Sequence, residues 1–255
     1  MKLDPDVVRV LDDARIDGCK LFLGAQLARP LYERTNKVLV ALGGRWERKA
    51  KAHVFDSDPR DVIATALDEG SITTARDLGY FPTPTSLARS LVVRAGIRPG
   101  DVVVEPSAGE GAIVAELIAA GADVRAVEVD GGRAATLRGR FSGLDVLQRD
   151  WLQTHPAMLN VPRIDAIVMN PPFRLEGRAQ ADVDHVSYAL DCVREGGSLV
   201  AVMSAGVTFR QTSAARQLRA RVEAMGGSFE PLPEGAFKAS GTDVRAVVLT
   251  VRGVR

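Results

Sequence analysis

The sequence predicts an α/β protein built around a mostly parallel β-sheet, and three observations support this prediction. From about residue 97 onward, short β-branched runs alternate with longer amphipathic segments, which is the pattern of successive βα units. A glycine-containing loop, Gly109-Glu110-Gly111, joins the first run to a segment with helix-forming composition. Acidic residues close three consecutive runs: Glu105, Glu128 and Asp150. Because ligands bind at the carboxyl ends of parallel strands, this edge of the sheet is the expected site.

Six apolar runs are the expected strands of this sheet, and four amphipathic stretches are the expected helices between them. The strands are placed at residues 101–105, 123–128, 144–147, 164–169, 198–203 and 244–251, and the helices near 111–120, 131–140, 182–194 and 211–225. Gly196-Gly197 and Gly226-Gly227 follow two of these helices, where glycine readily takes the left-handed conformation of a helix end. The alternation therefore extends through most of the second half of the chain.

Residues 1–78 lack this alternation and are predicted to form a small, mainly helical N-terminal segment, distinct from a domain at 79–255. Between Arg29 and Lys51 there are seven basic residues and two acidic ones. Such a patch suits contact with a phosphate backbone, and an aromatic ring within it can stack on a base. An ordinary solvated surface explains the same residues equally well. The candidate nucleic-acid contacts are Arg45, Trp46, Arg48, Lys49 and Lys51.

Composition and charge exclude several classes of function. The formal net charge of +1 provides no global attraction to nucleic acid or to a membrane surface. The two cysteines, Cys19 and Cys192, share no metal-binding spacing with each other or with the histidines, so free thiols and no metal site are expected. The N-terminus is too polar for a signal peptide, and no apolar run reaches membrane-spanning length. A cytoplasmic protein is therefore predicted.

Asn170-Pro171-Pro172-Phe173, directly after the apolar run 164–169, is the most informative stretch of the chain. Each proline fixes its own φ and lacks an N–H, so this turn is stiff and does not pair onward in a sheet. The carbonyl oxygens and the Asn170 side chain are then free to accept hydrogen bonds from an amino group of a ligand, beside the flat ring of Phe173. Taken alone, the four residues are also compatible with a turn that has no chemical role.

The loop at residues 105–111, Glu-Pro-Ser-Ala-Gly-Glu-Gly, lacks the third glycine of the dinucleotide fingerprint. Its leading acid, Glu105, suits a ligand with an ammonium group better than a pyrophosphate. Glu128 occupies a strand end where a carboxylate commonly binds ribose hydroxyls. Asp150 could accept from an adenine amino group, with Trp151 beside the ring. Each acid alone also suits a helix cap or an exposed strand end, and only their joint placement favours a nucleoside site.

Upstream, Phe81-Pro82-Thr83-Pro84 opens a further predicted helix at residues 86–92. The order Phe-Pro-Thr-Pro, then the 105–111 loop, then Asn-Pro-Pro-Phe resembles the gamma arrangement of adenine-N6 DNA methyltransferases over roughly residues 79–252. The resemblance implies the Rossmann-like fold of class I methyltransferases, a mostly parallel seven-stranded sheet flanked by helices, with S-adenosylmethionine as cofactor. The implied cofactor contacts are Phe81 and Thr83 at the methionine end, Glu105, Ser107, Gly109 and Gly111 in the loop, Glu128 at the ribose, and Asp150 and Trp151 at the adenine.

The same resemblance implies methyl transfer from S-adenosylmethionine to the N6 amino group of adenine in duplex DNA, on a base flipped out of the helix. Asn170 Oδ1 and the Pro171 carbonyl would accept the two amine N–H groups, and Phe173 would stack on the base. Phe237 is the candidate for a second ring against that base, although it equally suits a loop residue that covers the sheet edge. Arg210 is the candidate for a phosphate contact. The predicted catalytic residues are Asn170, Pro171, Pro172 and Phe173.

Two departures from the family leave the substrate open. The family usually begins its loop motif with Asp, whereas this chain has Glu105. Gamma-type enzymes usually carry a recognition domain after the catalytic part, whereas this chain ends at Arg255. Either low sequence specificity or a shift of recognition to residues 1–78 and the 171–184 loop is therefore expected. RNA base methyltransferases, including those of ribosomal RNA, share Asn-Pro-Pro-Phe and are the main alternative. Protein glutamine methyltransferases use a similar motif, more often with Tyr in the last position.

Overall fold

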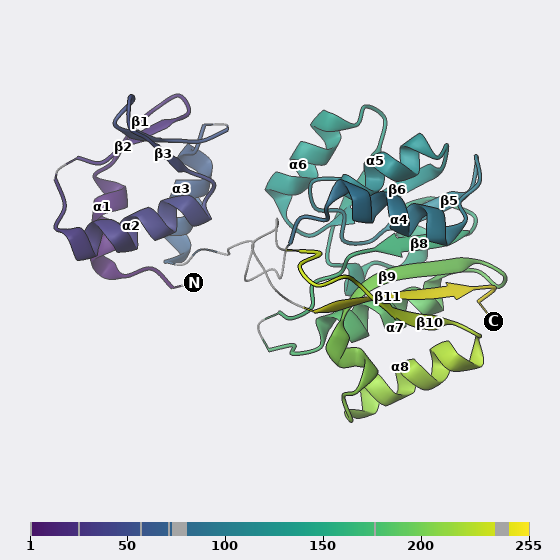
Figure 1. Ribbon diagram of the computed structural model, residues 1–255. Coiled ribbons are helices and arrows are strands. Elements are labelled where there is room, and N and C mark those ends of the chain that lie inside the picture. Colours follow the sequence, from purple (N-terminus) through teal and green to yellow (C-terminus); the bar gives the residue numbers. More distant parts are fainter. Residues whose placement is uncertain are drawn as a thin grey trace. The chain divides into compact units, whose positions relative to one another are not determined.

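The computed structural model divides the chain into two compact units, Met1–Leu78 and Gly79–Arg255 (Figure 1). It describes residues 2–24, 26–56, 58–70, 72, 81–175, 177–237 and 245–254. Each unit has a hydrophobic core of its own, as expected of a separate domain. No described helix combines the length and the apolarity that crossing a bilayer requires.

The larger unit contains a seven-stranded sheet in the order β10-β11-β9-β8-β5-β6-β7. Its strands are β5 (Val102–Glu105), β6 (Asp123–Glu128), β7 (Asp145–Gln148), β8 (Ala166–Met169), β9 (Ser198–Ser204), β10 (Ser228–Pro231) and β11 (Ala246–Arg252). Strands β5 to β9 run parallel, and β11 is antiparallel to both of its neighbours. The predicted mostly parallel, seven-stranded sheet is therefore confirmed. The six expected runs correspond to six of these strands, and β10 was not foreseen.

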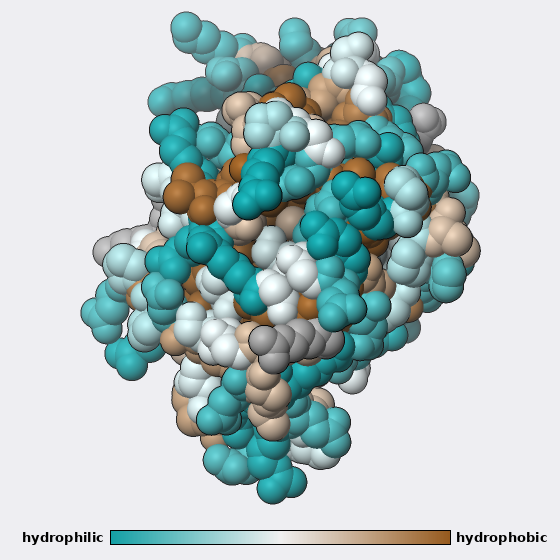
Figure 2. Space-filling model, turned by 90° about the vertical axis from the view of Figure 1, so that its right-hand side faces the viewer, coloured by the Kyte–Doolittle hydropathy of each residue, from teal (hydrophilic) through white to brown (hydrophobic). Residues whose placement is uncertain are grey.

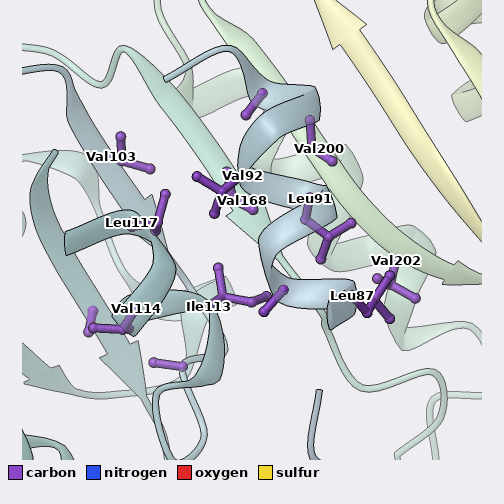
Figure 3. Packing of buried hydrophobic residues seen from close by; sticks show 14 of the residues in the cluster. Leu87, Leu91, Val92, Val103, Ile113, Val114, Leu117, Val168, Val200 and Val202 are labelled. Atoms are coloured by element: carbon purple, nitrogen blue, oxygen red, sulfur yellow. The ribbon is translucent and has the colours of Figure 1, made fainter. Parts of the chain in front are cut away.

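Helices cover both faces of this sheet. They are α4 (Thr85–Ala95), α5 (Ala112–Ala119), α6 (Gly131–Arg140), α7 (Ala181–Cys192) and α8 (Ser213–Ala224), with short 3₁₀ turns η1 (Trp151–Gln153), η2 (Pro156–Leu159) and η3 (Ala205–Thr208). Helices α4, α5 and α6 contribute to one buried cluster, and α7 and α8 to another. Figure 3 shows the first cluster, in which Leu91 and Leu117 lie with Val103 and Val168.

The central strands are buried on both faces, which places the polar side chains at their ends. Val168 belongs to the cluster under α4 and α5, whereas its neighbours Ile167 and Met169 belong to the cluster under α7 and α8. A strand covered on both sides reads as a continuous apolar run, as residues 164–169 do. The first polar side chain after β8 is therefore Asn170, at the carboxyl edge of the sheet.

The smaller unit combines three helices with a four-stranded antiparallel sheet of order β1-β2-β4-β3. Its elements are α1 (Pro5–Asp12), β1 (Arg15–Asp17), β2 (Lys20–Phe22), α2 (Arg29–Ala41), β3 (Arg45–Glu47), β4 (Ala52–Val54) and α3 (Arg60–Glu69). The core includes Leu11, Leu21, Leu39 and Phe55. The expected helices are present and hold more residues than the strands, and the four-stranded sheet was not foreseen. Each strand has only three residues, too few for a period-two pattern to be recognised.

Figure 2 shows one face of the molecule. Hydrophilic side chains predominate on it, and apolar ones form small separate patches rather than one broad area. This is the usual surface of a protein whose large apolar side chains are mostly enclosed.

Candidate active site

Asn170 is held against the Phe-Pro-Thr-Pro segment. Its Nδ2 donates to Thr83 Oγ1 at 3.0 Å and to the Phe81 carbonyl oxygen at 3.4 Å. Because a carbonyl oxygen only accepts, these contacts assign the nitrogen of the amide to this side and turn Oδ1 away from it. No donor within the described part of the chain reaches Asn170 Oδ1. The structure thus brings two distant motifs together and leaves one carbonyl-type acceptor open at the carboxyl edge of the sheet.

The residues after Asn170 form a compact apolar turn. Pro171 and Phe173 are buried and Pro172 is half-buried. The rings of Phe173 and Phe237 meet edge to face, with centroids 6.3 Å apart and an interplanar angle of 81°. Since the two side chains are only 9% and 2% exposed, stacking on a base requires Phe173 to expose a ring face that it does not expose here.

The loop after β5 is tied to two buried carboxylates. Ser107 N donates to Glu105 Oε1 at 3.0 Å, and Gly109 N donates to Glu128 Oε2 at 2.7 Å. The first bond holds the start of the loop, and the second joins the loop to the end of the neighbouring strand β6. The predicted loop residues therefore lie beside the predicted ribose carboxylate.

Gly111 begins helix α5 and cannot be replaced without disturbing its surroundings. Its φ of 86° lies in the left-handed region that favours glycine. A Cβ at this position would lie 2.5 Å from Phe141 Cε2 and 2.8 Å from Leu137 Cδ2. The glycine is thus required by the turn and by the close approach of the end of α6, independently of any ligand.

Glu105 is a buried carboxyl with an altered protonation equilibrium. It is 1% exposed, and burial raises its pKa to about 8; the Ser107 amide opposes this shift, and the negative charge of Glu128 adds to it. At neutral pH the free protein therefore holds a proton on Glu105. A cation bound next to this carboxyl would favour the ionised form, so the group fits a ligand with an ammonium group.

Glu128 is already well supplied with hydrogen bonds. It is 4% exposed and accepts from Gly109 N, from Asp130 N at 2.9 Å, and from Arg133 Nε and Nη2 at 3.1 and 2.9 Å. Three of these bonds converge on Oε1. Ribose hydroxyls would therefore compete with the Arg133 guanidinium for this oxygen. Arg133 is a residue of this site that the sequence analysis did not single out.

Replacing Glu128 with alanine is expected to raise the dissociation constant for S-adenosylmethionine by about tenfold or more, since hydrogen bonds to a charged group contribute about 1.5–3 kcal/mol. The change also removes the acceptor that holds Gly109 N. Isothermal titration calorimetry measures the effect. Asp123→Ala, at the exposed start of the same strand, is the matched control. Unchanged affinity in Glu128→Ala would remove the ribose assignment.

The side chains of Asp150 and Trp151, just after β7, make contacts with different parts of the protein. Asp150 Oδ1 accepts from Leu152 N at 3.0 Å and begins η1. Trp151 is 2% exposed, its Nε1 donates to the His185 carbonyl, and its ring packs on Tyr188 at 5.1 Å between centroids. The indole packs in the core beside α7 and presents no open ring face here, and its place beside an adenine stays a prediction.

Arg210, the predicted phosphate contact, makes its described contacts within the protein. Its Nη2 donates to Ser204 Oγ at 3.3 Å, its Nη1 is buried, and the guanidinium covers Gly206. The nearby Asp182 is fully buried; burial raises its pKa to about 6, opposed by bonds from Ser204 N and Val183 N and by the charge of Arg210. Arg210 is therefore turned inward toward Asp182 instead of outward to a phosphate.

His185 is buried on α7. Neither ring nitrogen has a hydrogen-bond partner among the described residues. Burial lowers its pKa to about 4, partly offset by the charge of Asp150, so the imidazole is neutral at physiological pH.

The candidate nucleic-acid contacts of the smaller unit lie on β3 and the turn that follows it. Arg45 pairs with Asp56 at 3.1 Å, and Trp46 is 46% exposed. Arg48, Lys49 and Lys51 are exposed in the turn between β3 and β4. Within the described residues, no group of three or more His, Cys, Asp or Glu side chains is arranged to hold a metal ion.

No family model matches the chain. Among curated relatives, it is 37% identical over 95 residues to a ribosomal RNA small subunit methyltransferase of Arabidopsis thaliana, 34% over 115 residues to ribosomal RNA small subunit methyltransferase A of Thermotoga neapolitana, and 31% over 106 residues to the dimethyladenosine transferase of Saccharomyces cerevisiae. These alignments cover 35%, 44% and 39% of this chain. They span only 26%, 43% and 32% of the relatives.

Solved structures share the fold at low sequence identity. A putative class I S-adenosylmethionine-dependent methyltransferase of Listeria monocytogenes matches with a TM-score of 0.53 and 16% identity, over 77% of this chain and 67% of that one. A modification subunit of a putative type I restriction enzyme from Vibrio vulnificus matches with a TM-score of 0.58 and 16% identity, over 89% and 53%. The larger unit thus has the Rossmann-like methyltransferase fold, and the cofactor that the fold and the relatives imply is S-adenosylmethionine.

Proposed function

We propose that the protein transfers a methyl group from S-adenosylmethionine to the N6 amino group of adenine in RNA, and that ribosomal RNA is its substrate class. The observation that carries this proposal is the anchored Asn170 amide, with Nδ2 bound to Thr83 and Phe81 and with no donor to Oδ1 among the described residues. An acceptor fixed in this way is suited to an exocyclic amine. S-adenosylmethionine supplies an already electrophilic methyl group.

The residues of the chain then have to activate the amine and position it. The lone pair of an exocyclic adenine nitrogen is delocalised into the ring, which makes it a poor nucleophile. Asn170 Oδ1 and the Pro171 carbonyl would accept its two N–H groups and favour the charge that develops on nitrogen during transfer. Because the amide is held by its own two hydrogen bonds, little reorganisation is needed in the reaction. Phe173, once turned to expose a ring face, would hold the base.

RNA is preferred over DNA because the curated relatives that align with the chain are named for ribosomal RNA or dimethyladenosine. The gamma-type motif order favours DNA, which is the alternative substrate. The likeness to a restriction-modification subunit, at 16% identity, extends to the fold alone. The exposed basic residues of the smaller unit support a nucleic-acid substrate of either kind.

The test is transfer of a tritiated methyl group to small-subunit ribosomal RNA, to a matched RNA and DNA oligonucleotide pair, and to duplex DNA, followed by nucleoside analysis. Methylated or dimethylated adenosine in RNA is the expected product, and Asn170→Ala is the inactive control. Label found only in DNA would show that the substrate is DNA and not RNA, with the same methyl-transfer reaction. Absence of label from every nucleic acid would overturn the proposal and direct attention to protein amides.

A further inference from the structure

The indole of Trp46 is partly exposed and packs against two other aromatic rings. It lies on β3 directly opposite His53 on β4. The Trp46 ring meets His53 at 5.2 Å and Tyr32 of α2 at 6.3 Å between centroids, with interplanar angles of 62° and 88°. With 46% of the residue still exposed, two rings support the indole while part of it faces solvent.

The support beneath Trp46 is itself fixed. His53 is fully buried, and its Nε2 is hydrogen-bonded to Asn36 Oδ1 at 2.9 Å, which ties β4 to α2. Burial lowers the pKa of His53, which favours the neutral form of the ring that packs against Trp46. The indole is therefore held at the surface, and little side-chain entropy remains to be lost when a flat ligand stacks on it.

Unpaired cations follow Trp46 in the chain. Arg48, Lys49 and Lys51 are exposed in the β3–β4 turn, and none of them has a carboxylate partner among the residues that the structure describes. Three of the other four basic residues of this region are paired: Arg29 with Glu33, Arg34 with Asp4 and Asp6, and Arg45 with Asp56. The fourth, Lys37 on α2, has no carboxylate partner among the described residues. Lys51 has a φ of 50°, a left-handed conformation that is unfavourable for lysine. The turn thus keeps three available cations, one of them at a strained position.

We propose that Trp46 and the turn residues Arg48, Lys49 and Lys51 form a docking platform for unpaired nucleotides of the RNA substrate. One base stacks on the exposed face of Trp46, and the turn cations contact the adjoining phosphates. A duplex does not suit this surface, because its base faces are already stacked and its grooves admit a helix or a longer ribbon rather than a single ring. Naming RNA rests on the proposed function, whereas stacking and charge contact do not depend on methyl transfer.

Tryptophan fluorescence of the full-length chain tests the stacking. The chain has two tryptophans, and Trp151 is 2% exposed, so an accessible signal comes from Trp46. Without cofactor, a single-stranded RNA oligonucleotide is expected to quench the emission saturably, and a duplex RNA of the same composition to do so only at much higher concentration. Trp46→Phe should abolish the quench but retain most of the affinity measured with a labelled oligonucleotide. Trp46→Ala should weaken that affinity by roughly 5- to 150-fold.

A charge-matched pair of variants tests the turn. Log affinity falls with log salt concentration, and each single-strand phosphate contact contributes about 0.7 to the steepness of this fall. Changing Arg48, Lys49 and Lys51 together to alanine is therefore expected to make the slope less steep by about 2. Changing Arg29, Arg34 and Arg60 instead, each of which pairs with a carboxylate, should leave the slope nearly unchanged.

Three results would each overturn the proposed docking platform. They are equal salt slopes in the two triple variants, unchanged RNA affinity in Trp46→Ala, and binding of duplex RNA as tight as that of single-stranded RNA. All these measurements read binding, so their failure would leave the proposed methyl transfer untouched. Absence of methyl transfer would likewise leave a positive binding result standing.

Discussion

Replacing Asn170 with alanine is expected to lower the single-turnover rate of methyl transfer by about 10²- to 10³-fold, the range found when one preorganised hydrogen-bonding group is removed from a charge-stabilising site. Affinity for S-adenosylmethionine should change far less, because Asn170 is not itself a predicted cofactor contact and the change leaves Phe81 and Thr83, which it contacts, in the chain. Rapid-quench transfer and calorimetry on the same preparation separate the two quantities.

Thr83→Val is the matched comparison. It keeps the shape of Thr83 and the acceptor Oδ1 of Asn170 but removes the hydroxyl that receives Nδ2 at 3.0 Å. The amide retains only its longer bond to the Phe81 carbonyl, so a smaller loss of rate than in Asn170→Ala is expected. Ordinary turnover in Asn170→Ala would remove the activation mechanism. A loss of cofactor affinity as large as the loss of rate would assign Asn170 to binding instead.

The parallel sheet could be predicted because its inner strands are buried on both faces. Residues 164–169 read as a continuous apolar run for this reason, and their neighbours alternate with helices long enough to recognise. Strand β10 could not be predicted, because most of its four residues are exposed and it ends in Pro231, so it has no apolar run that would indicate a strand. The sheet of the smaller unit escaped because pairing between three-residue strands, not their own pattern, holds it together.

Sequence spacing located the segments of the candidate site better than it located the side chains. The Phe-Pro-Thr-Pro segment and Asn170 meet because the chain returns to the same sheet edge. Sequence spacing does not determine whether a side chain at that edge points inward. The packing of Trp151 into the core and the inward turn of Arg210 could therefore not be predicted. Asp182 itself looked like an ordinary acidic residue in the first turn of a helix.

The two acids beside the glycine loop have different partners. Glu128 receives a guanidinium, whereas Glu105 receives only a backbone amide and lies close enough to Glu128 for the two negative charges to repel. A buried carboxyl group without a cationic partner favours its neutral form. A ligand that brings a positive charge to Glu105 would supply what the free protein lacks. Binding of such a ligand should therefore release a proton.

This linkage also sets the sign of the pH dependence of stability. The pKa of Glu105 is raised in the folded protein from 4.5 to about 8, so the folded state retains a proton that the unfolded chain has lost. The stabilising contribution of this group is fully present below pH 4.5 and is lost as the pH rises through about 8. Glu105→Gln, which resembles the protonated form, should remove this part of the pH dependence of the free energy of unfolding.

For ligand binding the sign is opposite, and the effect is large. If the ammonium group of the ligand requires ionised Glu105, affinity should increase by about 50-fold from two pH units below the pKa of about 8 to the pKa itself, because the ionised fraction of the carboxyl rises from about 1% to about 50%. S-adenosylhomocysteine is the suitable probe, because it keeps the ammonium group and cannot react. Calorimetry at pH 6 in buffers of different ionisation enthalpy should record release of nearly one proton by the wild type and none by Glu105→Gln. Equal wild-type affinity at pH 6 and 8 would mean that Glu105 stays protonated in the complex, and the ammonium group would then have to be held by other residues.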